Sequence, residues 1–103
     1  MQSVYASKLT KEKIWPDFSP HFRSPFTAAS YESDIREVME YFKRDFWKVR
    51  EAEVETYFRW MEHKVEQGIL SGATVAKKFR ELHSFAEFAC ENREQYRLGK
   101  GYQ

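Results

Sequence analysis

Residues 70–92 read LSGATVAKKFRELHSFAEFACEN, and this stretch decides the fold class. Its apolar side chains recur at intervals of three and four residues, which is the period of one face of an α-helix. Ser71 is a good N-cap residue, so we expect a helix from about Gly72 to Asn92 that buries this face. The residues of the expected buried face are Val75, Phe79, Leu82, Phe85, Ala86 and Ala89.

Two further segments show the same periodicity. The first begins near Thr27 or Ser30, both credible N-caps, and runs to about Arg44. The second runs from about Glu51 to Gln67, and Gly68 follows as a glycine that ends the helix. Three such helices can close a compact bundle. We therefore expect an all-α fold, a bundle of three to four helices.

The two ends of the chain look different from this helical part. All three prolines lie in residues 1–26, which we expect to form an irregular arm with at most a short helical turn around residues 8–14. Residues 93–103 contain two glycines and show no periodicity, as expected for the start of a linker. The predicted organisation is an arm over 1–26, a helical domain over 27–92 and a linker over 93–103.

Composition limits the class of protein. A chain of 103 residues is one domain, and four glycines and three prolines are too few for a fold of many short strands. There is no apolar run long enough to span a membrane, and a single cysteine, Cys90, allows no internal disulfide. We therefore expect a cytoplasmic protein. A net charge of +1 argues against a basic protein that simply coats DNA.

The faces opposite the apolar stripes are candidates for function. On the helix over 51–67, the far stripe holds Ala52, Thr56, Arg59 and His63. On the helix over 72–92, it holds Ala73, Lys77, Arg80 and Ser84. Neither stripe contains an acid. Such stripes suit DNA, because Arg and Lys neutralise phosphates, hydroxyls donate to them, and alanine allows close approach. A solvated polar face gives the same pattern, so the two readings stay open.

Catalytic and metal-binding patterns are not found. The three histidines have no metal-ligand spacing with Cys90 or with one another, and the chain has no glycine-rich phosphate loop or nucleophile elbow. Ser71 and Thr74 open a helix, where free N–H groups attract phosphate, although an N-cap needs no such role. We expect no cofactor, no metal and no enzyme activity in these residues alone.

Three motifs resemble the N-terminal SAM-like, core-binding domain of tyrosine recombinases and phage integrases. Residues 27–35, TAASYESDI, are similar to the family pattern Thr/Ser-x-x-Thr-Tyr-x-x-Asp-Leu, and residues 70–85 to Leu-Ser-x-x-Thr-Ile-x-x-basic-Leu-x-x-Leu-Arg-x-Phe. Between them, the family's apolar helix and its glycine are matched by Val54, Tyr57, Phe58, Met61 and Gly68. Two departures stand out. His83 replaces a frequent Arg, and the proline-containing arm takes the place of the helix that precedes Thr27 in the family.

The resemblance implies a function and partners. It implies a domain that clamps the core site of double-stranded DNA, while a separate catalytic domain of the same polypeptide supplies the Arg, Lys, His and Tyr of the reaction. Other recombinase protomers on the DNA are implied as partners, in a bacterial or phage-encoded system. The implied DNA-facing residues, by position in the motifs, are Thr27, Ser30, Ser71, Thr74, Lys77, Lys78, Arg80 and His83. Thr56, Arg59 and Ser84 are added from the acid-free stripes.

One alternative belongs to another functional class. The near-neutral charge and the aromatic residues Trp60 and Phe88, which we expect to be exposed, favour a small helical protein-interaction domain with no nucleic-acid role.

Overall fold

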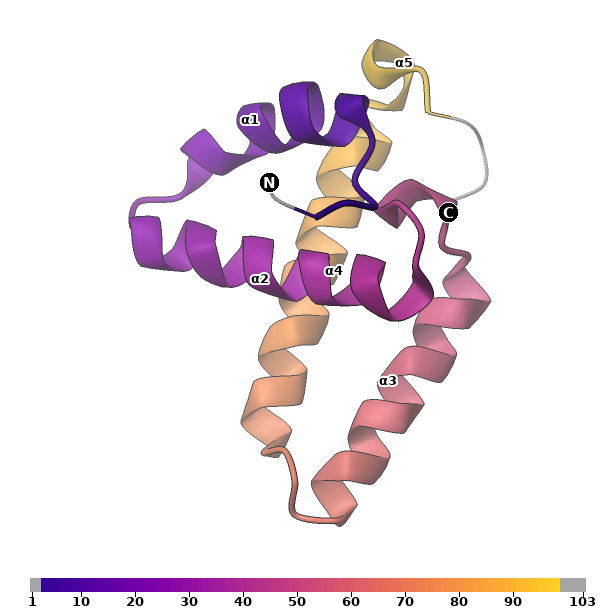
Figure 1. The fold of residues 1–103 in the computed structure, drawn as a ribbon. Helices are drawn as coiled ribbons and strands as arrows, with labels where there is room; N and C mark the ends of the chain where they lie inside the picture. Colours follow the sequence, from indigo (N-terminus) through magenta and orange to yellow (C-terminus); the bar gives the residue numbers. More distant parts are fainter. Residues whose placement is uncertain (1–2, 99–103) are drawn as a thin grey trace.

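The structure is a computed structural model that describes residues 3–98. Over this range the chain is helical and contains no strand, so the expected all-α fold is confirmed (Figure 1). Three helices, α2, α3 and α4, make up most of it, and short helical turns surround them. The elements are η1 (Thr10–Ile14), α1 (Trp15–Phe18), η2 (Ser19–His21), α2 (Pro25–Phe42), η3 (Phe46–Lys48), α3 (Glu51–Glu66), α4 (Gly72–Glu91) and α5 (Arg93–Tyr96).

The N-terminal segment is helical from Lys8 to His21, so the expectation of an irregular arm was wrong. A π-helical turn precedes Pro16: the amide of Trp15 bonds to the carbonyl of Thr10, five residues back. This wider turn admits a proline, whose ring would disrupt regular α-helical bonding. The segment is held by tertiary contacts. The buried Thr10 hydroxyl donates to Asp45 at 3.1 Å and accepts from the Trp47 indole N–H at 3.1 Å.

Helix α2 begins before the expected Thr27 or Ser30. Ser24 is its N-cap, because the Ser24 hydroxyl accepts a hydrogen bond from the amide of Phe26 at 3.2 Å. Pro25 occupies the first turn, where its missing N–H costs nothing. Thr27 and Ser30 therefore lie within the first turns of the helix, and their hydroxyls are not caps. The helix ends at Phe42, just before Lys43, which takes a left-handed conformation.

The bounds of helices α3 and α4 are close to those that the sequence predicts. Gly68 has a φ of +75°, the conformation that closes α3, and Ser71 caps α4 by accepting from the amide of Thr74 at 3.1 Å. The two helices are joined by this short turn and diverge from it, and α2 crosses the middle of α4 (Figure 1). This arrangement gives α4 two flanks, one beside α2 and one beside α3.

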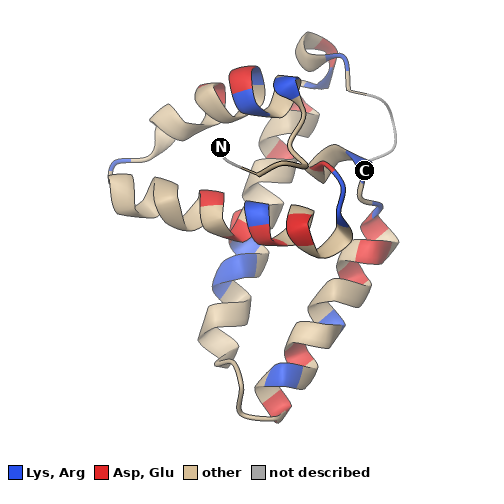
Figure 2. Cartoon of the chain, viewed as in Figure 1, with Lys and Arg blue, Asp and Glu red and all other residues tan. Residues whose placement is uncertain are grey.

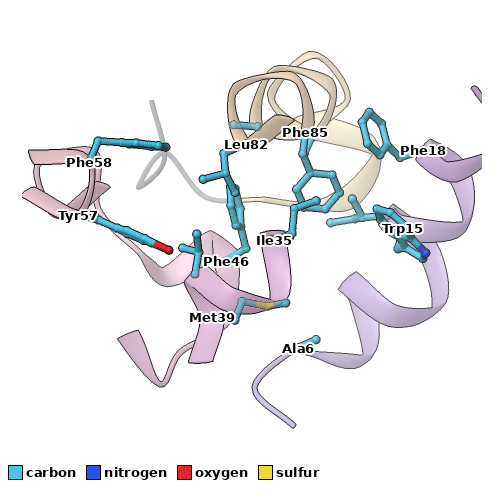
Figure 3. Close-up of a cluster of buried hydrophobic side chains, with 14 of the residues drawn as sticks. Ala6, Trp15, Phe18, Ile35, Met39, Phe46, Tyr57, Phe58, Leu82 and Phe85 are labelled. Carbon is cyan, nitrogen blue, oxygen red and sulfur yellow. The ribbon is translucent and has the colours of Figure 1, made fainter. Parts of the chain in front are cut away.

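The core is aromatic and centres on Phe85 of α4 (Figure 3). The rings of Trp15, Phe18, Phe46 and Trp47 lie 6.1, 5.2, 5.2 and 5.1 Å from the Phe85 ring, between centroids. The core thus joins the N-terminal helical segment to α4 and η3. Phe79, which the sequence assigns to the buried face, is instead 53% exposed, and Phe26 is 86% exposed.

The segment after α4 also packs on the body. Its short helix α5 buries Tyr96, whose hydroxyl donates to Asp17 Oδ2 at 2.7 Å. Residues 93–98 therefore do not have the character of a linker. The rest of the predicted linker, residues 99–103, lies outside the described residues.

Candidate nucleic-acid interface

A cleft of about 450 Å³ forms where the first turns of α2 lie beside α4, and we call it the α2–α4 cleft. Four of the sequence-predicted residues line it together, although 47 positions separate Ser30 from Lys77 in the chain. Figure 2 shows the basic residues of α4 gathered in the part of the helix that approaches α2. The residues that line the cleft are Phe26, Thr27, Ser30, Tyr31, Lys77, Arg80 and Glu81.

Lys77 and Arg80 are both exposed at the cleft, and Lys77 makes polar contacts across it with α2. The ammonium of Lys77 donates to the hydroxyl of Ser30 and lies 3.5 Å from Glu81 Oε1. Ser30 thus positions Lys77 between the two helices. A cation, a guanidinium and the hydroxyls of Thr27 and Ser30 are groups that bind phosphate oxygens.

Lys78 has a different environment from its neighbour. It is half-buried, and its ammonium donates to Asp34 Oδ1 at 2.7 Å and to Glu37 Oε2 at 3.0 Å. Burial acts to lower the pKa of Lys78, but these two hydrogen bonds outweigh it and raise the pKa above its ordinary value. Lys78 therefore compensates charge inside the protein at the crossing of α2 and α4.

Two buried carboxyl groups meet at the floor of the cleft. Glu81 of α4 is 3% exposed, and the buried Asp34 of α2 contacts it. Burial, and then the contact with Asp34, raise the pKa of Glu81 to about 7. Burial opposes ionisation of Asp34 as well, but the Glu81 and Lys78 contacts lower its pKa.

A shared proton explains the polar atoms at this floor. Both Glu81 carboxylate oxygens and Asp34 Oδ2 are buried with no hydrogen-bond donor when both groups are ionised. Two carboxylates can only accept, so a proton on Glu81 supplies the missing donor to Asp34. The carboxyl pair then carries one negative charge, on Asp34, and Lys78 binds that carboxylate together with Glu37.

The start of α4 holds two more predicted residues. The Ser71 hydroxyl accepts from the Thr74 amide, and the two hydroxyl oxygens lie 2.7 Å apart. Ser84, also predicted, is half-buried and lies one turn beyond Arg80. These three residues belong to α4 but do not line the cleft.

Three other predicted residues are not on the cleft. Arg59 and His83 line a separate groove between α3 and α4, beside several glutamates. Arg59 lies 3.8 Å from Glu55 and His83 lies 3.9 Å from Glu87, each one helical turn away. The Thr56 hydroxyl donates to the carbonyl of Ala52 at 3.1 Å, on the same helix as Arg59.

The sequence pattern missed the acids at the cleft. Asp34 and Glu37 contact the lysines only because α2 crosses α4, whereas Glu81 lies one turn from Lys77 on α4 itself. A weak signal was present, since Asp34 directly precedes Ile35 on the apolar stripe of its helix. An acid beside such a stripe is often drawn into the interior with a partner.

The fold and the cleft together define a class of protein, namely an all-helical domain with a small basic cleft between two helices. Residues 20–93 match the model of the family described as phage integrase, N-terminal SAM-like domain. The chain belongs to this family, which is a family of tyrosine recombinases, and the resemblance seen in the sequence is confirmed. The matched domain is not the catalytic one. No curated protein and no solved structure matches the chain.

Residues 3–98 contain neither a metal-binding cluster nor a membrane-spanning helix. No group of three or more His, Cys, Asp or Glu in this range is arranged to hold a metal ion. None of the helices described is both long enough and apolar enough to cross a bilayer.

Proposed function

We propose that this domain binds the recombination core site of double-stranded DNA through the α2–α4 cleft. One observation carries the proposal. Thr27, Ser30, Lys77 and Arg80, which come from two separate motifs, line one cleft. The catalytic step would then belong to a separate domain of the same polypeptide, and other protomers would occupy the same DNA, in the cytoplasm of a bacterium.

The electrostatics of the cleft support phosphate binding. The raised pKa of Glu81 reduces the negative charge at the cleft, and Lys78 pairs with Asp34, so Lys77 and Arg80 are the charged groups that the cleft exposes. This is a small basic surface on a protein with a net charge of +1. Affinity would come from a few phosphate contacts and not from a general positive field.

The remaining predicted residues rank lower as DNA contacts. Ser71, Thr74 and Ser84 extend the surface along α4 and can donate to phosphates at its edge. Lys78 acts from within by balancing Asp34. Thr56 is on α3, and Arg59 and His83 lie beside the glutamates of the α3–α4 groove, which would repel a DNA backbone.

The test is a titration of a DNA duplex of about 30 base pairs at several salt concentrations, followed by fluorescence anisotropy. We expect Lys77→Ala plus Arg80→Ala to weaken binding at least ~10-fold at low salt and to reduce the log–log salt slope by about 2. Arg59→Ala is the matched control, because it removes one exposed guanidinium from the other flank of α4, and it should leave the slope nearly unchanged. An equal effect of Arg59→Ala, or no binding at low salt, would refute the proposal.

A protein-interaction role has its own supporting observation. Trp60 is 39% exposed and Tyr41 is 47% exposed, and their rings lie 5.1 Å apart between centroids. Phe88, the other aromatic residue expected at the surface, is only partly exposed and packs on Phe18 at 5.2 Å. The Tyr41–Trp60 pair is therefore the part of this alternative that the packing supports.

A further inference from the structure

A groove of about 700 Å³ runs between α3 and α4, on the flank of α4 opposite the α2–α4 cleft. Its floor is apolar and is formed by Val54, Phe58, Phe79, Leu82 and Ala86. The ring of Phe79 is at the centre of this floor, 5.1 Å from the Phe58 ring and stacked parallel on His83 at 6.2 Å. A hydrophobic groove is the kind of surface into which an amphipathic helix lays its apolar face.

The rim of the groove is acidic. Four carboxylates, Glu51, Glu55, Glu62 and Glu87, stand around the floor, against one guanidinium, Arg59, and the imidazole of His83. Arg59 and His83 each lie beside a rim glutamate, at 3.8 and 3.9 Å, and the four carboxylates still outnumber the one guanidinium. The rim would repel DNA and anionic lipid and attract a partner rich in Lys or Arg.

The dimensions fit a helix. On α3 the lining residues run from Glu51 to Glu62, which at 1.5 Å per residue is about 16 Å of helix. That length matches about three turns of a bound helix, enough for apolar anchors at positions i, i+4 and i+7. The two walls are themselves diverging helices, a shape into which a third helix can pack (Figure 1).

We propose that the α3–α4 groove binds an amphipathic helix of a protein partner, with an apolar face seated on Phe79 and Lys or Arg residues along both edges. This inference does not depend on DNA binding, because it uses the other flank of α4. It assigns the domain a protein-docking surface beside its proposed nucleic-acid surface.

Two synthetic helical peptides test the proposal, each about 17 residues long with leucines at i, i+4 and i+7. One carries lysines on the flanking positions and the other carries glutamates. Cys90 lines the groove and is the only cysteine, so its rate of alkylation by iodoacetamide reports occupancy. We expect the lysine peptide to slow alkylation at least ~3-fold and to bind at least ~10-fold more tightly than the glutamate peptide.

Variants then locate the binding. Phe79→Ser should weaken binding of the lysine peptide at least ~5-fold. Trp60→Ser, at another exposed aromatic residue, should change the affinity less than ~2-fold. Glu55→Gln plus Glu87→Gln alters only exposed rim residues and should also weaken binding, which gives a second test if Phe79→Ser does not fold. Lys77→Ala plus Arg80→Ala should have no effect on peptide binding, which separates this result from the DNA proposal.

Equal binding of both peptides would overturn the inference. Loss of binding in Trp60→Ser, or self-association that protects Cys90 without peptide, would do the same.

Discussion

Lys78 of α4 donates a hydrogen bond to Asp34 of α2 across the point where the two helices cross, with 2.7 Å between Nζ and Oδ1. Both side chains are largely withdrawn from water, with 14% and 9% of their surface exposed. A buried ion needs a close partner of opposite charge, because water no longer stabilises it. This pair therefore fixes how α2 lies on α4, and with it the width of the α2–α4 cleft.

Replacing Lys78 should destabilise the protein strongly. Lys78→Met keeps the aliphatic chain but removes the cation that is hydrogen-bonded to the buried Asp34 carboxylate and leaves only Lys77, at 3.9 Å, so we expect a loss of about 2–4 kcal/mol in the free energy of unfolding. Urea denaturation followed by circular dichroism measures it. Lys77→Met is the matched control. Because Lys77 is half-exposed, its replacement should lower the free energy of unfolding by less than about 1 kcal/mol. Similar losses of stability in both variants would contradict the expectation that the ion pair of Lys78 with Asp34 holds α2 on α4.

Stability should depend on pH through Glu81. Its pKa is about 7 in the folded protein and 4.5 ordinarily, so between these values the folded protein holds a proton that the unfolded chain has released. The free energy of unfolding should therefore be higher near pH 5 than near pH 8, by about 1–2 kcal/mol once screening by Lys77 is allowed for. Asp34 acts in the opposite sense, because its lowered pKa makes its contribution disappear in acid, below its ordinary 3.8.

Urea denaturation between pH 5 and pH 8 measures this dependence. Glu81→Gln keeps a donor at the same place and should flatten the profile over that range. Glu87→Gln, at an exposed position on the same helix, should leave the profile as in the original protein. A flat profile before any substitution would contradict the shared proton at the floor of the cleft.

The turn between α3 and α4 depends on one glycine. At Gly68, φ is +75° and a Cβ would meet no atom within 4 Å, so only backbone strain opposes a side chain there. Gly68→Ala should lower the free energy of unfolding by about 1 kcal/mol. Gly72→Ala, also with open space but with no positive φ, should be neutral or slightly stabilising. Thermal melting of the two variants, side by side, tests the difference.

The hydroxyl of Tyr96 should hold α5 on the N-terminal segment. Its bond to Asp17 is 2.7 Å long, and burial together with this bond raises the pKa of Tyr96. Tyr96→Phe should cost about 1 kcal/mol. A double-mutant cycle with Asp17→Ala should yield a coupling energy of at least about 0.5 kcal/mol in denaturation experiments. Strictly additive effects would mean that the two groups stabilise the fold separately.

The elements predicted best are those with local signals. The bounds of α3 and α4 follow from apolar spacing, from Ser71 as a cap and from the glycine at 68, all of which act within one turn. The N-terminal helix was missed because its prolines indicate a break, whereas contacts with Asp45, Trp47 and Phe85 hold it in place. Such contacts join residues far apart in the chain and leave no periodic trace.

Part of the candidate site could also be predicted from the sequence, and part could not. Thr27, Ser30, Lys77 and Arg80 could be named from motifs and helix faces. The burial of Glu81 and the exposure of Phe79 could not, because spacing along α4 does not say which flank meets a neighbour and how closely. The pairing of Lys78 with Asp34 likewise depends on the crossing of two helices that are distant in sequence.

The joining of the two ends of the domain has a consequence for synthesis. Trp15 and Phe18 leave the ribosome well before their partner Phe85, and Asp17 leaves it before Tyr96, whose hydroxyl it binds. At 5–20 residues per second, roughly 70 residues of synthesis take on the order of several seconds. During that interval the aromatic rings of the N-terminal segment stay uncovered, and exposed apolar surface of this kind makes a folding chain prone to aggregation.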